Sequence, residues 1–318
     1  MDYIKPGYEL ERVNKTVLIN HIDGCGMALP GVMPAPNMMV RAPWLKGLLA
    51  TFDFLNFCKV HDVSPVIRDA WGEEHDLVQE NIKVIFTISQ FKLWKYYDNW
   101  QNYIREFKRC GCHLCATNYE ESWIGDTTLN YQMTQALVDF TDEEIKIYTA
   151  NAKEKLNNLA TDKETMLRAL GADEPDDDPH LIALRIYPEL LRDGYERATL
   201  KAIKKRMLLD SKSGVILCRN KRLFAIPDLY AACEFWFLGQ EHPKGLLQDG
   251  YVYSKLCTSV DEVDVLRSPS LYMEHAVRKC DHNPELRKWF NTNGIYTSCH
   301  DLISRVLQFD KQRCRVWK

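Results

Sequence analysis

Residues 21–49 read HIDGCGMALPGVMPAPNMMVRAPWLKGLL, and this stretch decides what kind of fold the first third of the chain can form. Turn-forming residues recur in it at Asp23-Gly24, Pro30-Gly31 and Pro34-Ala35-Pro36, and short apolar runs such as Met38–Val40 lie between them. Proline lacks a backbone donor and glycine favours turns, so a helix cannot continue through this pattern. The stretch therefore predicts short strands joined by tight loops.

Two periodic segments follow. Ile82–Thr87 (IKVIFT) is rich in β-branched residues and predicts a strand. From Ser89 to Phe107, apolar and aromatic side chains recur at three- and four-residue spacing. This second pattern predicts a helix with an aromatic face, for which Ser89 is the expected N-cap.

The middle of the chain has a helical pattern from Tyr131 to Leu170, with a capping box that begins at Thr141. Ala172–Pro179 (ADEPDDDP) combines acidic residues with proline and predicts an exposed linker. Tyr195–Leu209 predicts a second helix, which is basic. Its cations are Arg197, Lys201, Lys204, Lys205 and Arg206.

Strand patterns return in the last third, at Val215–Cys218, Leu223–Ile226 and Tyr251–Leu256. The sequence therefore predicts an α+β fold in which two strand-bearing regions are joined by a helical segment. We expect the boundaries to fall at residues 1–125, 126–212 and 213–318.

Composition narrows the class of protein. The chain has 318 residues, a formal net charge of -3, 46% hydrophobic residues and 27% charged residues, as expected of a globular protein. It has no run of about 18 apolar residues and no secretory pattern at its N-terminus, so we expect no membrane segment and a location in the cytoplasm. The eleven cysteines are then expected to be reduced thiols.

Basic residues lie next to aromatic residues in two places. Arg41, Trp44 and Lys46 share a segment punctuated by proline and glycine, and Lys92 is followed by Trp94, Lys95, Tyr96 and Tyr97. Such mixtures suit phosphate contacts combined with stacking on bases. The alternative is a solvated surface beside aromatic residues that belong to the core.

Cysteine is concentrated at Cys110-Gly-Cys112-His113-Leu-Cys115, which offers up to four zinc ligands. The spacing is crowded and no second pair of ligands follows at a distance. Structural or incidental cysteines are therefore favoured, and zinc is not expected. The chain also contains no glycine-rich phosphate loop, G-x-S-x-G or H-E-x-x-H motif, which disfavours hydrolases.

Taken together, these segments resemble the single-subunit RNA polymerases of SPβ-type Bacillus prophages and their Firmicutes relatives. That family is akin to the eukaryotic RNA-dependent RNA polymerases of gene silencing. The resemblance spans most of the chain, in the order found in the family. It is carried by His21–Leu49 with Phe52-Asp53-Phe54, by Ile82–Trp94, by Asn130–Glu144 and by Gly214–Asp310.

The resemblance implies two double-psi β-barrels that face each other across a cleft, joined by helices. Arg41, Lys46 and Lys92 match segments that hold phosphates. Arg267, in Arg267-Ser-Pro-Ser-Leu271, matches an R-x-P-T-L turn that contacts the incoming nucleotide. The implied partners are a nucleic-acid template, product RNA and nucleoside triphosphates, and the implied cofactor is Mg²⁺ on a D-x-D-G-D loop.

The sequence departs from the family pattern at that loop. Asp310 stands where the first aspartate belongs, but Lys311-Gln-Arg313-Cys-Arg315 follows it. Cations beside a divalent metal raise its energy, so we expect an incomplete Mg²⁺ site at Asp310 and a catalytically inactive chain. We also expect both barrels to be incomplete and the chain to be a truncated or frameshifted piece of a polymerase, whose missing remainder is a possible partner.

Two alternatives remain from the residues alone. One is a non-catalytic nucleic-acid-binding module that uses Arg41, Lys46 and Lys92. The other is a small zinc-binding interaction protein built on the cysteine segment that begins at Cys110.

Overall fold

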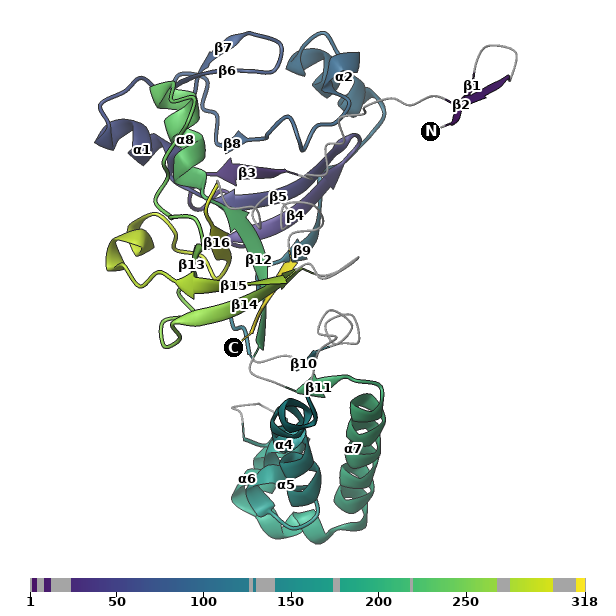
Figure 1. Ribbon diagram of the computed structural model, residues 1–318. Coiled ribbons are helices and arrows are strands. Elements are labelled where there is room, and N and C mark those ends of the chain that lie inside the picture. The colour runs from purple at the N-terminus through teal and green to yellow at the C-terminus, as the bar shows by residue number, and fades with distance from the viewer. Residues whose placement is uncertain are drawn as a thin grey trace.

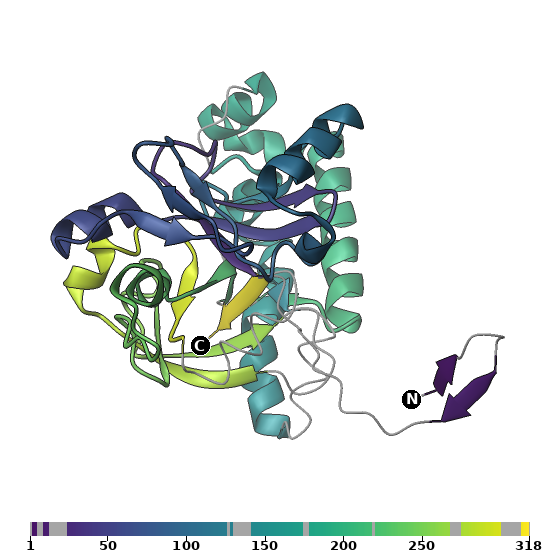
Figure 2. The ribbon, with the colours of Figure 1, turned by 90° about the horizontal axis from the view of Figure 1, so that it is seen from above.

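Two β-rich units, one from each end of the chain, lie side by side in the computed structural model, and a group of helices extends from them (Figure 1). The structure describes residues 2–4, 9–12, 24–125, 128–129, 141–173, 178–217, 220–267, 275–299 and 313–317. Helices and strands are both present in quantity, so the predicted α+β class is confirmed. A short hairpin, β1 (Asp2–Ile4) with β2 (Leu10–Arg12), stands apart from the rest in Figures 1 and 2.

The N-terminal unit is built on a five-stranded sheet. Its strands are β3 (Cys25–Ala28), β4 (Asn37–Ala42), β5 (Leu45–Thr51), β8 (Val84–Ile85) and β9 (Cys115–Tyr119), in the spatial order β8-β3-β5-β4-β9. β3 and β5 are parallel, whereas β4 and β5 form an antiparallel hairpin around Pro43 and Trp44. The predicted short strands with tight loops are therefore present.

The segment after this hairpin differs from the prediction at two points. Only Val84 and Ile85 of the predicted strand Ile82–Thr87 belong to β8, because these two residues alone are paired with β3. The predicted helix Ser89–Phe107 is also wrong in its first half. The 3-10 helix η1 (Trp94–Tyr96) precedes α2 (Trp100–Arg109), which is capped by Asn99 and not by Ser89. Phe91 is held in a bridge to Leu45, which prevents a helix there.

Around the sheet lie α1 (Phe54–Val60) and the hairpin of β6 (Val66–Arg68) with β7 (Glu74–Asp76). α1 is capped by Asp53, whose carboxylate accepts a 2.9 Å hydrogen bond from the backbone N–H of Asn56.

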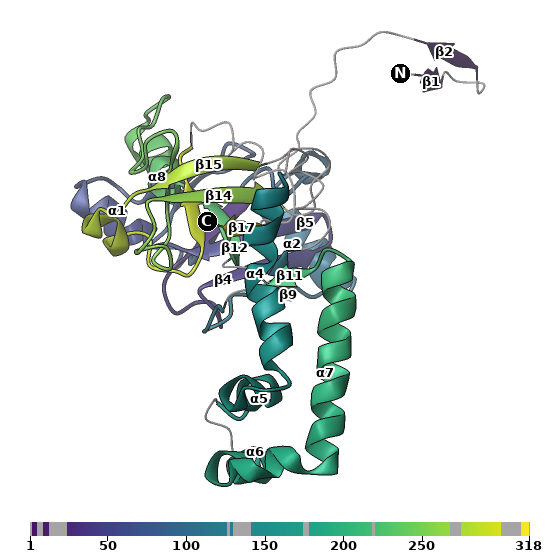
Figure 3. The same cartoon turned by 60° about the horizontal axis from the view of Figure 1, so that its bottom comes forward.

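Helices occupy the middle of the chain, as predicted, but in more pieces (Figure 3). They are α4 (Asp142–Asn158), α5 (Lys163–Leu170), α6 (Pro179–Ile186), the 3-10 helix η2 (Pro188–Arg192) and α7 (Gly194–Lys212). Two short strands, β10 (Thr128–Leu129) and β11 (Ile216–Leu217), pair where this segment meets the rest of the chain.

The capping box at Thr141 and the basic helix are confirmed. The continuous helical pattern to Leu170 is interrupted, because Asp162 caps a new helix. Part of it, residues 131–140, lies outside the described residues. The acidic linker ends earlier than predicted. Pro179 is the first residue of α6, a position where its missing N–H costs no hydrogen bond.

The C-terminal unit is a ring of six strands. They are β12 (Asn220–Pro227), β13 (Tyr251–Tyr253), β14 (Glu262–Arg267), β15 (His275–Cys280), β16 (Ile295–Thr297) and β17 (Arg313–Trp317), in the closed order β12-β16-β13-β15-β14-β17. The pairs β12–β16 and β13–β15 are parallel. Helix α8 (Leu229–Leu238) and the 3-10 helix η3 (Pro284–Lys288) lie beside the ring.

These strands correct several predictions. The ring closes through β17, where an incomplete barrel was predicted. β12 is longer than the predicted Leu223–Ile226, because its first residues pair with β17. β13 stops at Tyr253, since the next residues form a turn in which the N–H of Cys257 bonds to the carbonyl of Ser254 at 3.0 Å. Of the predicted strand Val215–Cys218, Ile216 and Leu217 form β11 and Cys218 lies outside the described residues.

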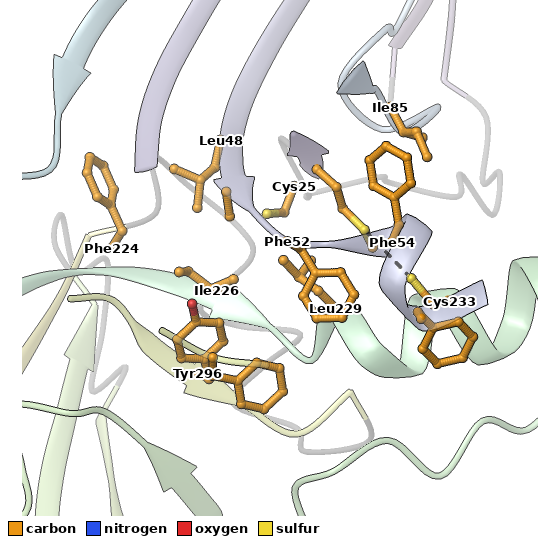
Figure 4. Close-up of a cluster of buried hydrophobic side chains, with 14 of the residues drawn as sticks. Cys25, Leu48, Phe52, Phe54, Ile85, Phe224, Ile226, Leu229, Cys233 and Tyr296 are labelled. Carbon is orange, nitrogen blue, oxygen red and sulfur yellow. Dashed lines mark hydrogen bonds between the residues drawn. The ribbon is translucent and has the colours of Figure 1, made fainter. Parts of the chain in front are cut away.

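One apolar core is shared by the two β-rich units. Figure 4 shows Leu48 and Phe52 from the first unit packed toward Ile226 and Tyr296 from the second, and all four side chains are fully or almost fully buried. The helices α1 and α8 extend this contact. The ring of Phe57 on α1 is edge-on to that of Tyr230 on α8, with 4.8 Å between the ring centroids. Neither unit could bury its inner face without the other.

A buried polar network crosses the same boundary. Asn37 on β4 donates from its amide to the carboxylate of Glu120 and, at 2.8 Å, to the hydroxyl of Thr292. The other carboxylate oxygen of Glu120 accepts from the backbone N–H of Asn293 at 2.9 Å, and Thr292 is 2.7 Å from the hydroxyl of Tyr296. Burial raises the pKa of Glu120, although the bonds from Asn293 and Asn37 act in the opposite direction.

None of the helices in the described part of the chain is long and apolar enough to cross a membrane. Nine of the cysteines in the described part of the chain have described side chains, and each of these nine is a free thiol.

The raised pKa of Glu120 predicts a pH dependence of stability. The folded state holds this proton more tightly than the unfolded state, so the free energy of unfolding falls as pH rises from about 4.5 through the folded-state pKa. Each unit of difference between the pKa of Glu120 in the folded state and in the unfolded state corresponds to about 1.4 kcal/mol of stability. Glu120→Gln removes this contribution, and Glu121→Gln, at an exposed neighbour, keeps it. Urea unfolding of the three proteins between pH 4.5 and 7.5 measures the difference, and parallel curves for all three would contradict the assignment.

Candidate nucleic-acid interface

The two basic-aromatic segments singled out in the sequence meet in the structure. Leu45, at the start of β5, forms an antiparallel bridge with Phe91. The backbone N–H of the next residue, Lys46, donates to the carbonyl of Gln90 at 3.0 Å. The β4–β5 hairpin and the loop around Phe91 therefore form one surface, although about 40 residues separate them in the sequence.

Three of the predicted site residues lie on this surface. Arg41 on β4 and Lys46 on β5 are directly opposite each other in the strand register. Lys92 follows the bridging Phe91, and both Arg41 and Lys92 are exposed. We call the residues Arg41, Trp44, Lys46, Lys92 and Tyr96 the hairpin surface.

Trp44 occupies an unusual backbone position at the tip of the hairpin. Its φ is 62°, in the left-handed region that residues other than glycine rarely adopt, and its side chain is 56% exposed. The tip is held by Tyr103 of α2, whose hydroxyl donates to the carbonyl of Pro43 at 2.9 Å. The chain therefore holds a strained backbone at a residue whose indole lies largely in solvent.

The aromatic residues of the second segment divide into two groups. Phe91 and Tyr103 are buried, with ring centroids 4.6 Å apart, and Trp100 packs against Tyr103 at 5.2 Å. By contrast, Tyr96 is 81% exposed. The interpretation of core aromatic residues is therefore confirmed for Phe91 and Tyr103, whereas the ring of Tyr96 is exposed to solvent.

Gln90, which the sequence analysis did not identify, holds this loop in place. Its side chain is fully buried, accepts from the N–H of Thr87 at 2.9 Å and donates to the carbonyl of Leu48 at 2.8 Å. Gly26 leaves room for it, because a Cβ there would lie 2.6 Å from the Gln90 side-chain oxygen. A glutamine within a predicted helix carries no sequence signal of such a role.

The remaining predicted site residues belong to the other unit or lie outside the description. Arg267 is the last residue of β14 and is paired in register with Cys314 of β17. Asp310 lies outside the described residues, as do the residues Ser268–Leu271 of the predicted nucleotide-contacting turn. The described contacts thus bring together Arg41, Lys46 and Lys92 and do not extend to Arg267.

The sequence after Asp310 lacks the carboxylates of the Mg²⁺ site that the family implies. Of the residues after Asp310, Lys311, Arg313 and Arg315 are cations, and carboxylate oxygens are the ligands that Mg²⁺ needs. Within the described ranges, one group of three metal-binding side chains converges, namely Asp69, Glu73 and His75 near the β6–β7 hairpin.

Hydrogen bonds within this group and to Glu80 account for its arrangement. His75 lies 2.9 Å from a Glu80 carboxylate oxygen and 3.3 Å from one of Asp69, and the hydrogen bond to Glu80 is the main cause of its raised pKa. Asp69 also accepts from the N–H groups of Trp71 and Glu73. The candidate zinc ligands from Cys110 to Cys115, which are also among the described residues, do not form such a group.

No protein-family model matches the chain. It is 46% identical over 316 residues to the DNA-directed RNA polymerase YonO of Bacillus phage SPbeta, a match that covers 98% of this chain and 37% of that protein. The chain thus spans about 37% of the length of this relative. The family resemblance predicted from the sequence is confirmed.

Among solved structures, the fold is similar to that of the RNA-dependent RNA polymerase QDE-1 from Thielavia terrestris. The TM-score is 0.56 at 14% sequence identity, with 94% of this chain and 34% of that chain covered. At this identity the similarity concerns the fold alone.

The backbone of Trp44 predicts an unusual effect of substitution. Glycine adopts a positive φ without strain, so Trp44→Gly is expected to raise the free energy of unfolding by up to about 1 kcal/mol. Tyr96→Gly is the matched control, an exposed aromatic without a positive φ, and should lower it by about 0.5–1 kcal/mol. Chemical denaturation measures both, and an equal loss in the two variants would show that Trp44 is not strained.

Proposed function

Since the chain resembles an SPβ-type phage RNA polymerase over 98% of its length, we propose that it forms the nucleic-acid-binding part of a template-directed RNA polymerase. The reaction class is nucleotidyl transfer, in which a nucleoside triphosphate is added to an RNA 3′ end. The observation that carries the proposal is the contact between the β4–β5 hairpin and the loop at Phe91, which brings together two segments that contain three cations and two exposed aromatic residues.

In this proposal, the two β-rich units correspond to the two double-psi barrels of the family. Parallel pairs within otherwise antiparallel sheets support it: β3 with β5 in the first unit, and β12 with β16 and β13 with β15 in the second. The domains are then residues 1–125, 126–212 and 213–318, and the second is a helical connector with its own small core.

The hairpin surface is suited to a single strand or the open end of a hybrid. Arg41, Lys46 and Lys92 neutralise phosphates, and Trp44 and Tyr96 offer rings on which bases stack. We assign Arg267 to the incoming nucleotide, because a guanidinium is a fixed cation that binds phosphate or sugar oxygens.

The chemistry requires metal-bound carboxylates, and residues 311–318, which follow Asp310, contain none. We propose Asp310 as the one carboxylate of the family's metal loop that is present here. Mg²⁺, when bound, would activate the 3′ hydroxyl and offset charge on the triphosphate. With cations at Lys311, Arg313 and Arg315, the chain is expected to bind nucleic acid and not to synthesise RNA.

This combination also favours the alternative of a non-catalytic nucleic-acid-binding module. Binding at the hairpin surface is common to both functions, so RNA synthesis is the activity that separates them. The zinc-binding alternative has no support in the geometry of the cysteine segment.

Binding to single-stranded oligonucleotide tests the hairpin surface. For a fluorescent 20-nucleotide oligo(dT), the affinity should fall with salt, and the triple variant Arg41→Gln, Lys46→Gln, Lys92→Gln should reduce the log–log salt slope by about 2. Trp44→Ala should weaken binding about 5- to 100-fold with the slope unchanged, because stacking is not a charge effect. Lys59→Gln, at an exposed residue of α1, is the control. An unchanged slope in the triple variant would refute the assignment.

Primer extension tests the proposed lack of catalysis. A labelled RNA primer on a DNA template, with nucleoside triphosphates and Mg²⁺, should not be extended by this chain. Retention of the same primer–template in a binding assay shows that the protein is folded and competent to bind. Mg²⁺-dependent extension would overturn the interpretation of the residues after Asp310.

A further inference from the structure

Helix α7 has a row of cations that is separate from the hairpin surface. Arg197, Lys201, Lys204, Lys205 and Lys212 fall within about 100° of the helix circumference at 3.6 residues per turn. From the first to the last, the row is about 22 Å long at 1.5 Å per residue. We call these five residues the α7 stripe.

The stripe lies beside the face of α7 that packs on the helical segment. On that face Glu196 and Leu200 are buried, and Ile203 and Met207 pack with the small core formed by α4 to α7. All members of the stripe are exposed except Lys204, which is half-buried at its edge. Figure 3 shows α7 at one edge of the group of helices.

Acidic groups are absent from this face of the helix. α7 has six cations and two carboxylates, and both carboxylates lie off the stripe. Glu196 is buried beside His180 at 2.8 Å, and Asp210 lies 4.0 Å from Arg206. The whole chain has a net charge of -3, so the stripe is a local excess of positive charge on an acidic protein.

The stripe differs from the hairpin surface in having no aromatic side chain. The apolar residue Leu208 lies on the same side of the helix as the stripe, and Tyr195 lies on a different side. A surface that has cations and no rings can contact phosphates but cannot stack on unpaired bases. Duplex DNA presents a phosphate charge about every 1.7 Å along its axis, so a rigid 22 Å row of cations can contact several phosphates at once.

We propose that the α7 stripe is a second nucleic-acid-binding site, which binds the backbone of double-stranded DNA without reading its sequence. This goes beyond the proposed function, because it assigns a different form of nucleic acid to a different domain. On this proposal, the chain holds duplex on the helical segment and single strand on the hairpin surface.

The test uses the full 318-residue chain and a fluorescent 30-base-pair DNA duplex of random sequence. The variant Arg197→Gln, Lys201→Gln, Lys205→Gln should reduce the log–log salt slope of duplex binding by about 2 to 3. At 100 mM salt we expect at least a tenfold loss of affinity. Binding of oligo(dT) should change less than twofold. Glutamine is a good helix former, so α7 should persist, and circular dichroism checks this.

The control variant removes the same number of charges elsewhere, at the exposed residues Lys59, Lys244 and Lys288, each changed to glutamine. It should retain duplex binding. Equal losses in the two triple variants, or no loss in the α7 variant, would overturn the proposal; the second result would also be expected if the stripe binds an acidic protein. If the α7 variant lost oligo(dT) binding as well as duplex binding, the proposed selectivity of the α7 stripe for duplex would be refuted. The assignment of single-stranded nucleic acid to the hairpin surface is tested separately, because only the variants of Arg41, Trp44, Lys46 and Lys92 report on it.

Discussion

The apolar core shared by the two β-rich units is the contact on which the rest of the structure depends. Leu48 and Phe52 come from near the start of the chain and Ile226 and Tyr296 from its last third, and each is buried against the other set. Burial of such side chains contributes about 1.5–3 kcal/mol each. The helical segment between the two units has its own small core around Leu184, so its packing does not depend on the core that the two units share.

The core also explains how the candidate interface is positioned. The middle of β5 is anchored in the core at Leu48, and Gln90 binds the carbonyl of that same residue. The loop that contains Phe91 and Lys92 is therefore held against the strand that contains Lys46. Backbone strain at Trp44 costs about 1–3 kcal/mol. A strained residue of this kind persists only where the surrounding structure fixes its backbone geometry. Here the bridge at Leu45 and the hydrogen bond from Tyr103 do so.

Charge is distributed unevenly over this chain, and the proposals depend on that distribution. Cations gather on the hairpin surface with exposed rings and on α7 without them, while the acidic residues that balance them lie elsewhere, for example around the β6–β7 hairpin. An acidic protein can therefore offer two separate phosphate-binding surfaces.

The sequence by itself determined the α+β class, the capping box at Thr141, the basic helix that became α7, and the family resemblance. These follow from local chemistry: a cap satisfies its own backbone, and helical periodicity is visible without knowledge of a partner. Only the tertiary structure decided that Ser89–Phe107 is not one helix, because the bridge from Phe91 to Leu45 lies between residues distant in the chain. It likewise decided that Gln90 and Glu120 are buried and bonded, and that the residues around Trp44 and Lys92 form one surface. Such features depend on which segments meet in space, and no local pattern specifies that.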